Sequence, residues 1–259
     1  MVNGIESFRH YFKDYEDQYI IIGGTACDLL MTSYGLDSRA TKDIDLVLII
    51  EALTSDFGNQ LWKYINEARY EHMDKSTNIP QFYRFCKPKS RDYPAMLEIF
   101  SRRMDGISFP DDAILSPIPL GKEISSLSAI ILDDDYYQFL KEGKIVVNDI
   151  TVLDAAYLIP FKAKAWLDLN ERKLNGEPVD SKDIKKHKND IYRLSQIVSN
   201  NASIAVASNI YRDITQFLEL IKYDSVDLKQ MNILESKESI IDRLSKIYWI
   251  TSKDTIEAL

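Results

Sequence analysis

Two aspartates interrupt the start of an otherwise apolar stretch, TKDIDLVLII at residues 41–50. The stretch is rich in aliphatic and β-branched residues, which favour a β-strand. Side chains at positions i and i+2 of a strand point to the same face, so Asp43 and Asp45 are expected to lie side by side. Ionised carboxylates on such a face cost free energy unless positive charge pairs with them. The pair therefore predicts a nearby cation, either a local side chain such as Arg39 or Lys42, or a bound ion.

A third carboxylate, Glu98, interrupts a second apolar strand, AMLEIFSR at residues 95–102. Glu98 can be an edge-strand side chain that faces water. If its strand neighbours the aspartate strand, however, three carboxylates meet at one place, and such close like charges cannot all stay ionised without cations. Mg²⁺ prefers oxygen ligands and usually brings a substrate's phosphates with it. Two such ions can stabilise the attacking and leaving oxygens of an in-line displacement. We therefore expect Asp43, Asp45 and Glu98 to bind Mg²⁺, with two ions and a nucleoside triphosphate (NTP).

A glycine pair lies between a predicted strand at 19–22 and a predicted helix at 25–35. Gly23 and Gly24 allow the backbone to approach a ligand closely, and the amides of the following helix start, near Thr25, can face a phosphate. The alternative is that a tight strand-to-helix turn needs glycine for steric reasons alone. The segment is neither a Walker A loop nor a Rossmann fingerprint, because Gly-Lys-Ser/Thr and GxGxxG are absent.

The composition is that of an ordinary globular protein, with 259 residues, 45% hydrophobic and 28% charged. The formal net charge of -8 argues mildly against a general nucleic-acid coat, although a local basic patch can still hold RNA. Cys27 and Cys86 lack CxxC spacing, which favours free thiols over a zinc site. No signal peptide and no membrane-spanning run is visible, so we expect a cytoplasmic protein without a membrane partner.

The order of the predicted elements indicates an α/β (α+β) fold with a small mixed sheet and helices on one face, followed by a helical part. Further elements are expected as helices at 4–17 and around 58–70, strands at 81–87 and 95–102, and a hairpin at 144–153 that turns at Asn148-Asp149. Beyond Asp154 the sequence is persistently helical, with no clear strand. We therefore predict two domains, 1–152 and 153–259.

The run GGTACDLL…SRATKDIDLVLI resembles the nucleotidyltransferase signature of the DNA polymerase β superfamily, a Gly-Gly or Gly-Ser followed downstream by Asp-x-Asp. The long gap between Gly24 and Asp43, with its approach R-x-T-x-D-I-D, is similar to the AbiEii/AbiGii toxin group. The resemblance covers residues 18–51 and, by position only, residues 82–102. It implies that the first domain is a polymerase β-like nucleotidyltransferase domain.

The resemblance also implies roles for single residues. Metal and catalytic roles fall on Asp43, Asp45 and Glu98. Nucleotide-binding roles fall on Gly23 and Gly24, which would contact the triphosphate, and on Thr25 and Arg39.

The later stretches LIPFKAKAWLDLNERK and SKDIKKHKNDIYRL resemble the helical half of AbiEii-type proteins, which has a lysine on one helix and an aspartate on a later one. Lys164 and Asp190 match best, with Lys162 close behind, which implies a catalytic Lys164 and nucleotide-binding Lys162 and Asp190. Where the family often has a second acidic residue, this chain has Arg193. The alternative for the lysines is a solvated helix face whose stems cover the core. KKHK at 185–188 is either a solvated helix start or an RNA-backbone contact.

Together these features predict a Mg²⁺-dependent nucleotidyltransferase that moves a nucleoside monophosphate (NMP) from an NTP to an acceptor hydroxyl. The AbiEii-like half favours RNA or tRNA as the acceptor, in a toxin–antitoxin or phage-defence setting with a cognate antitoxin protein. The acidic net charge instead favours a small acceptor, as in antibiotic nucleotidyltransferases. A non-catalytic relative that binds nucleotide or a partner protein is the second alternative, but it leaves three costly carboxylates without a purpose.

Overall fold

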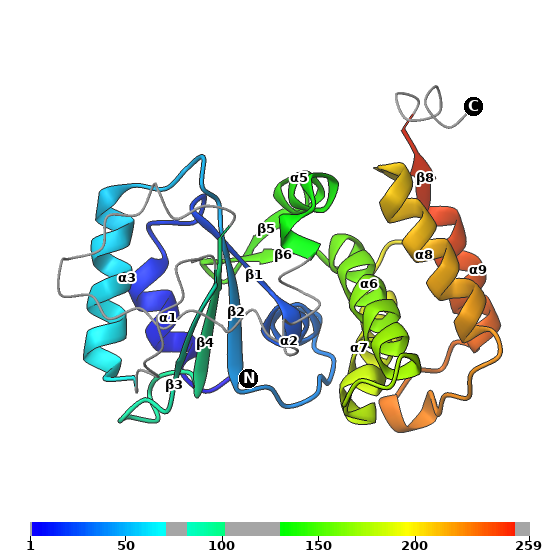
Figure 1. Ribbon diagram of the computed structural model, residues 1–259, viewed down its shortest axis with the longest axis horizontal. Helices are drawn as coiled ribbons and strands as arrows, with labels where there is room; N and C mark the ends of the chain where they lie inside the picture. Colours follow the sequence, from blue (N-terminus) through cyan, green and yellow to red (C-terminus); the bar gives the residue numbers. More distant parts are fainter. Residues whose placement is uncertain (1, 71–81, 102–129, 252–259) are drawn as a thin grey trace. The chain divides into compact units, whose positions relative to one another are not determined.

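The computed structural model describes residues 2–70, 82–101 and 130–251, which fold into two compact units (Figure 1). None of the helices in these parts of the chain has the length and apolar character that a membrane span requires. The units are built from the following parts of the chain: unit 1 from Met1–Leu132 and Lys144–Asp154, and unit 2 from Asp133–Gly143 and Ala155–Leu259.

Unit 1 is organised around a six-stranded mixed sheet. Its strands are β1 Tyr19–Ile22, β2 Asp43–Leu48, β3 Phe82–Cys86, β4 Met96–Phe100, β5 Lys144–Val147 and β6 Ile150–Leu153. They lie in the order β3-β4-β2-β1-β6-β5. β2 pairs with β1 antiparallel and with β4 parallel, and β4 pairs with β3 antiparallel. The predicted α/β class with a small mixed sheet is confirmed.

Helices cover both faces of this sheet, so the expectation that they pack on one face is wrong. They are α1 Ile5–Phe12, α2 Gly23–Ser33 and α3 Ser55–Ala68. Figure 1 shows α1 and α3 on one side of the sheet and α2 on the other. Tyr19 of β1 packs against Phe8 of α1 and Phe57 of α3, at ring-centroid distances of 5.4 and 6.5 Å. All four residues of β1 are buried, which requires cover on both faces of the strand.

The hairpin of β5 and β6 turns at Asn148 and Asp149, as predicted. Both residues have left-handed backbone conformations, with φ of 50° and 58°. A two-residue turn of this kind matches the twist of antiparallel strands, and asparagine and aspartate tolerate positive φ better than most residues. A local signal in the sequence was therefore sufficient to place this hairpin.

Unit 2 is mainly helical but also contains a small sheet. Its elements are α5 Asp134–Glu142, α6 Ala155–Leu174, α7 Ser181–Ser195, β7 Ile204–Val206, α8 Ser208–Ile221, the 3₁₀ helix η1 Lys229–Met231, α9 Lys237–Ile247 and β8 Tyr248–Ile250. β7 and β8 pair in parallel, so the expectation of no strand beyond Asp154 is wrong. Each strand has only three residues, which is too short for an alternating pattern to show.

β8 also repairs a defect in α6 that Pro160 creates. Proline has no N–H, so the carbonyl of Ala156, four residues earlier, loses its usual helical donor. The buried hydroxyl of Tyr248 donates to that carbonyl at 2.7 Å. The small sheet thus supplies the hydrogen bond that lets a proline lie inside a 20-residue helix.

α5 belongs to unit 2 although it lies between strands of unit 1 in the sequence. Its Tyr136 packs edge-on against Phe161 of α6 at 5.2 Å, and its Phe139 lies 4.6 Å from Tyr157. The chain therefore enters unit 2 at Asp133, returns to unit 1 for the hairpin, and enters unit 2 again at Ala155. Independent domains at 1–152 and 153–259 stay a prediction.

Candidate active site

The strand register brings the predicted carboxylates to neighbouring positions in unit 1. β2 and β4 are adjacent and parallel, with Asp45 opposite Glu98 and Asp43 opposite Met96. Because paired residues share a face of the sheet, Asp43, Asp45 and Glu98 all lie on the same face. Both aspartates are half-buried and Glu98 is 8% exposed. The expected adjacency of the two strands is confirmed.

Glu98 has a cationic partner on its other side. Arg84 of β3 is paired with Glu98 in the register of β3 and β4, and its Nε donates to Glu98 Oε1 at 2.6 Å. The Glu98 side chain is 10% exposed and that of Arg84 is 38% exposed. Across the described ranges, no group of three or more His, Cys, Asp or Glu side chains is arranged to hold a metal ion. Sequence reasoning missed Arg84.

Two glycines at the start of α2 make room for the charged side chains of the site. α2 begins at Gly23, two residues earlier than predicted. Gly23 has a φ of +71°, and a Cβ there would lie 1.8 Å from Asp45 Oδ2. A Cβ on Gly24 would lie 2.6 Å from a terminal nitrogen of Arg39. Steric need therefore accounts for both glycines, and it places the Asp45 carboxylate and the Arg39 guanidinium against the helix start.

Thr25 also joins α2 to the aspartate strand. Its hydroxyl donates to the main-chain carbonyl of Asp43. The first turn of α2 is thereby fixed to the first residue of β2, so predicted nucleotide-binding and metal-binding residues meet at one end of both elements. Backbone amides at a helix start favour anions.

The chemistry of this donor set fits Mg²⁺. Asp43 and Asp45 provide carboxylate oxygens from one face of one strand, and Glu98 provides a third carboxylate in register with Asp45. Hard divalent cations bind such oxygen ligands. Gly23 also leaves the space that the Asp45 carboxylate occupies at the start of α2, which suits a metal-binding role for this side chain. The metal-binding roles of these residues stay a prediction.

We expect Gly23→Ala to weaken Mg²⁺ and NTP binding, because the new Cβ would displace the Asp45 carboxylate. Gly35→Ala is the matched control: Gly35 has a similar φ of +69°, but a Cβ there meets nothing within 4 Å. Each variant should lose about 1–2 kcal/mol from backbone strain, and Gly23→Ala should lose more. Thermal melting with and without Mg²⁺ and NTP measures both effects. If Mg²⁺ and NTP raised the melting temperatures of the two variants equally, the predicted role of Asp45 in binding them would be contradicted.

The helical half contains a buried ion pair between α6 and α7. Lys162 of α6, not Lys164, pairs with Asp190 of α7, with 2.7 Å between Nζ and Oδ2 and side chains only 4% and 0% exposed. Arg193 lies 3.7 Å from the other oxygen of Asp190. Residues two apart on a helix point in different directions, so only one of the two lysines can face α7 at this level.

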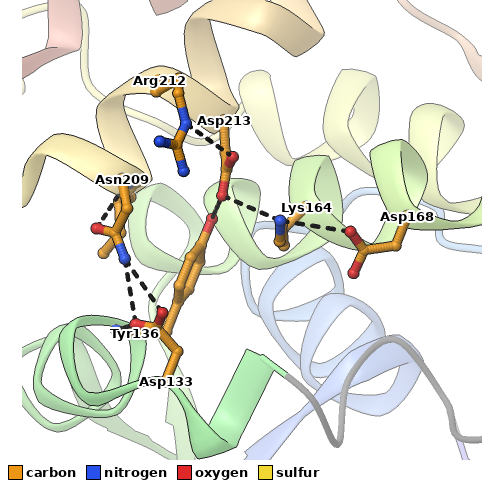
Figure 2. A network of polar contacts seen from close by, with 8 residues as sticks. Asp133, Tyr136, Lys164, Asp168, Asn209, Arg212 and Asp213 are labelled. Carbon is orange, nitrogen blue, oxygen red and sulfur yellow. Dashed lines mark hydrogen bonds and ion pairs between the residues drawn. The ribbon is translucent and has the colours of Figure 1, made fainter. Parts of the chain in front are cut away.

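Lys164 instead belongs to a polar network among α5, α6 and α8 (Figure 2). Its ammonium lies 3.4 Å from Asp168 and 3.5 Å from Asp213. The buried hydroxyl of Tyr136 donates to Asp213 at 3.1 Å. Sequence reasoning missed Asp213, although an aspartate within the apolar stripe of α8, beside Ile214, was a signal that could have found it.

The pH dependence of stability should report on Asp168. Burial raises the pKa of Asp168 above its usual value of 3.8, and the Lys164 ammonium offsets this only in part. The folded chain therefore holds this proton more tightly than the unfolded chain. The resulting stabilisation is complete below pH 3.8 and is lost as the pH rises through the folded-state pKa.

We expect Asp168→Asn to remove this dependence. The free energy of unfolding of the wild type minus that of the variant should fall as the pH rises above 3.8 and become constant once Asp168 is ionised in the folded chain. Urea denaturation of both proteins across that range measures it. A difference that rises with pH would mean that attraction to Lys164 outweighs burial.

The basic run at 185–188 lies within α7, which begins at Ser181, rather than at a helix start. Lys188 is buried and pairs with Asp224, while Lys186 pairs with Asp183. Lys185 is exposed and lines a groove of about 1230 Å³ in unit 2. The side chains that line this groove are of both signs, among them Lys173, Lys185, Arg193, Lys229, Asp224 and Glu238.

Comparisons with known proteins show the fold. No protein-family model matches the sequence, and neither does any curated protein. The crystal structure of an antigenic nucleotidyltransferase-like protein from Paracoccidioides brasiliensis is similar with a TM-score of 0.51 and 14% sequence identity, over 98% of each chain. JHP933 from Helicobacter pylori has a TM-score of 0.44 and 16% identity, over 94% of this chain and 88% of that one. At these identities the first likeness shows a nucleotidyltransferase-like fold and no more, and the second, weaker one carries no argument.

Proposed function

We propose that this protein is a Mg²⁺-dependent nucleotidyltransferase that moves an NMP from an NTP to an acceptor hydroxyl. One observation carries the proposal: Asp43 and Asp45 share a face with Glu98 in the neighbouring strand, beside the glycine-rich start of α2. The nucleotidyltransferase-like fold agrees with it. A non-catalytic protein would have no use for three carboxylates on one face of two neighbouring strands.

In unit 1 we assign one set of residues to the metal and another to the triphosphate. Asp43, Asp45 and Glu98 would hold Mg²⁺, which when bound supplies Lewis-acid stabilisation of the charge that develops during transfer. The amides at the start of α2 and the guanidinium of Arg39 would receive phosphate oxygens. Gly24 leaves the space in which that guanidinium lies against the helix start.

The roles of Lys162, Lys164 and Asp190 toward the nucleotide stay a prediction. Lys162 and Asp190 satisfy each other, and Lys164 contacts two carboxylates of unit 2. A direct contact of either lysine with phosphate would require it to exchange these partners. The loss of stability caused by substituting these lysines therefore has to be measured before a loss of activity is assigned to nucleotide binding.

For the acceptor we propose RNA, with tRNA in a toxin–antitoxin or phage-defence setting as the specific case and an antitoxin as the partner protein. The groove of unit 2 supports this choice, because about 1230 Å³ exceeds the roughly 300–1,000 Å³ of ordinary small-molecule sites. Exposed lysines such as Lys185 can contact a phosphate backbone. The acidic net charge of -8 favours the alternative, an antibiotic-type small acceptor.

Label transfer distinguishes these acceptors. The protein is incubated with Mg²⁺ and each of the NTPs in turn, labelled at the α-phosphate, together with total RNA or with a panel of aminoglycosides. Label that enters RNA of tRNA size supports the proposal, and label that enters only an aminoglycoside supports the alternative. If neither acceptor gains label with any NTP, while the protein is folded, the proposed activity is wrong.

A further inference from the structure

Three charged side chains form a row across the candidate site, one from each of three adjacent strands. Arg84 of β3 is paired with Glu98 of β4, and Glu98 is paired with Asp45 of β2. Paired residues of neighbouring strands point to the same face, so the order on this face is cation, carboxylate, carboxylate. Glu98 therefore lies between a guanidinium and the aspartates that we assign to Mg²⁺.

The contact between Arg84 and Glu98 is strong for its position. The distance from Nε to Oε1 is 2.6 Å, and the Glu98 side chain is only 10% exposed. A charge-assisted hydrogen bond of this length, with its acceptor largely shielded from water and its donor 38% exposed, favours one orientation of the carboxylate. In that orientation the Glu98 carboxylate is held by Arg84 of β3 and does not form one ligand group with Asp43 and Asp45. This agrees with the absence of a group of three metal ligands among the described residues.

We propose that Arg84 is a positioning residue that withholds Glu98 from Mg²⁺ until an NTP binds. The proposal rests on the proposed function. A divalent cation that arrives alone must compete with the guanidinium for Glu98 and is repelled by its charge. A triphosphate removes both obstacles. Its oxygens can accept the hydrogen bonds of the planar guanidinium in place of the Glu98 carboxylate, and their negative charge offsets the charge of Arg84. Arg84 thereby makes metal and nucleotide binding depend on each other, and such coupling is reciprocal.

The coupling has a functional consequence for the free protein. Without NTP, the site would hold Mg²⁺ through the two aspartates alone, and therefore weakly. With NTP, Arg84 would move to phosphate and Glu98 would complete the set of ligands. Metal would then be bound fully only when a substrate is present.

Mn²⁺ serves as the probe of this idea, with electron paramagnetic resonance of the free ion as the readout in the absence of nucleotide. Arg84→Gln should bind Mn²⁺ about tenfold more tightly than the wild type, because it removes a positive charge beside the site and a competitor for Glu98. Arg91→Gln is the matched control, since Arg91 is exposed in the segment between β3 and β4. It should bind Mn²⁺ like the wild type. Adding Glu98→Gln to Arg84→Gln should abolish the gain, because Glu98 is the ligand set free.

Two further measurements separate the possible failures. Calorimetric titration of the wild type with each NTP in the presence of Mn²⁺ shows whether nucleotide binds, and an absence of binding overturns both the proposed function and this inference. If nucleotide binds but Arg84→Gln has unchanged or weaker affinity for Mn²⁺, only the inference fails. If Arg84→Gln does not fold by circular dichroism, Arg84→Met replaces it, because methionine keeps an unbranched stem and removes both the charge and the hydrogen-bond donor. That variant should bind Mn²⁺ more tightly than the wild type, and unchanged affinity overturns the inference.

Discussion

Asp45→Asn is expected to lower the rate of NMP transfer by on the order of 10³-fold, the loss typical when one charge-stabilising group is removed from an active site. Asparagine keeps the size of the side chain, so it still fits the space beside Gly23, but it removes one of the charges that hold Mg²⁺. Asp45 is half-buried rather than fully enclosed, and the fold should therefore persist. Single-turnover label transfer measures the rate, and circular dichroism with thermal melting checks the fold.

Asp149→Asn is the matched control for that experiment. Asp149 is exposed at the turn of the β5–β6 hairpin, in the same unit, and asparagine tolerates its φ of 58°. This variant loses the same charge without touching the site, so it should transfer NMP at the wild-type rate. Equal rates in Asp45→Asn and Asp149→Asn would mean that Asp45 takes no part in catalysis.

The second large effect is expected in unit 2, where Lys162→Met should lower the free energy of unfolding by about 3–5 kcal/mol. Asp190 has a side chain that is 0% exposed, and the variant removes the ammonium that lies 2.7 Å from one of its oxygens, while Arg193 lies 3.7 Å from the other. Removing both charges, as Lys162→Met with Asp190→Leu, should recover most of the loss, because no unpaired charge then stays buried. Urea denaturation measures all three proteins.

Lys186→Met provides the comparison, on α7, the helix that carries Asp190. Its pair with Asp183 has side chains that are 41% and 50% exposed, and exposed pairs contribute about 0–1 kcal/mol. If Lys162→Met costs no more than Lys186→Met, the buried pair is not structural. Any loss of NMP transfer in Lys162→Met would then be direct evidence for the predicted role of Lys162 at the nucleotide.

The features that the sequence predicted well all have local signals. The apolar run of β1, the aspartates at the start of β2 and the Asn148-Asp149 turn are each determined by a few consecutive residues. The α/β class followed from the order of such elements. The adjacency of Glu98 to Asp45 was reached by a chemical argument, because two apolar strands interrupted by three carboxylates are easiest to explain when the carboxylates share cations.

The features that the sequence did not predict depend on long-range register. Nothing local shows that Arg84 lies opposite Glu98, because a shift of one residue in the pairing of β3 and β4 would put the two side chains on opposite faces. Likewise, Lys162 and Lys164 are equivalent by composition, and only the orientation of α6 against α7 and α8 assigns them different partners. β7 and β8 are three-residue strands whose pairing joins distant segments.

The most direct test of nucleotidyl transfer follows the two ends of the triphosphate in one reaction. The NTP that gives label transfer is prepared with label at either the α- or the γ-phosphate and incubated with Mg²⁺, acceptor RNA and the wild-type protein. The proposed function predicts that α-label enters the acceptor while γ-label leaves as pyrophosphate in equal amount. Transfer of the γ-label to the acceptor, or its release as orthophosphate without any α-label in the acceptor, would contradict it.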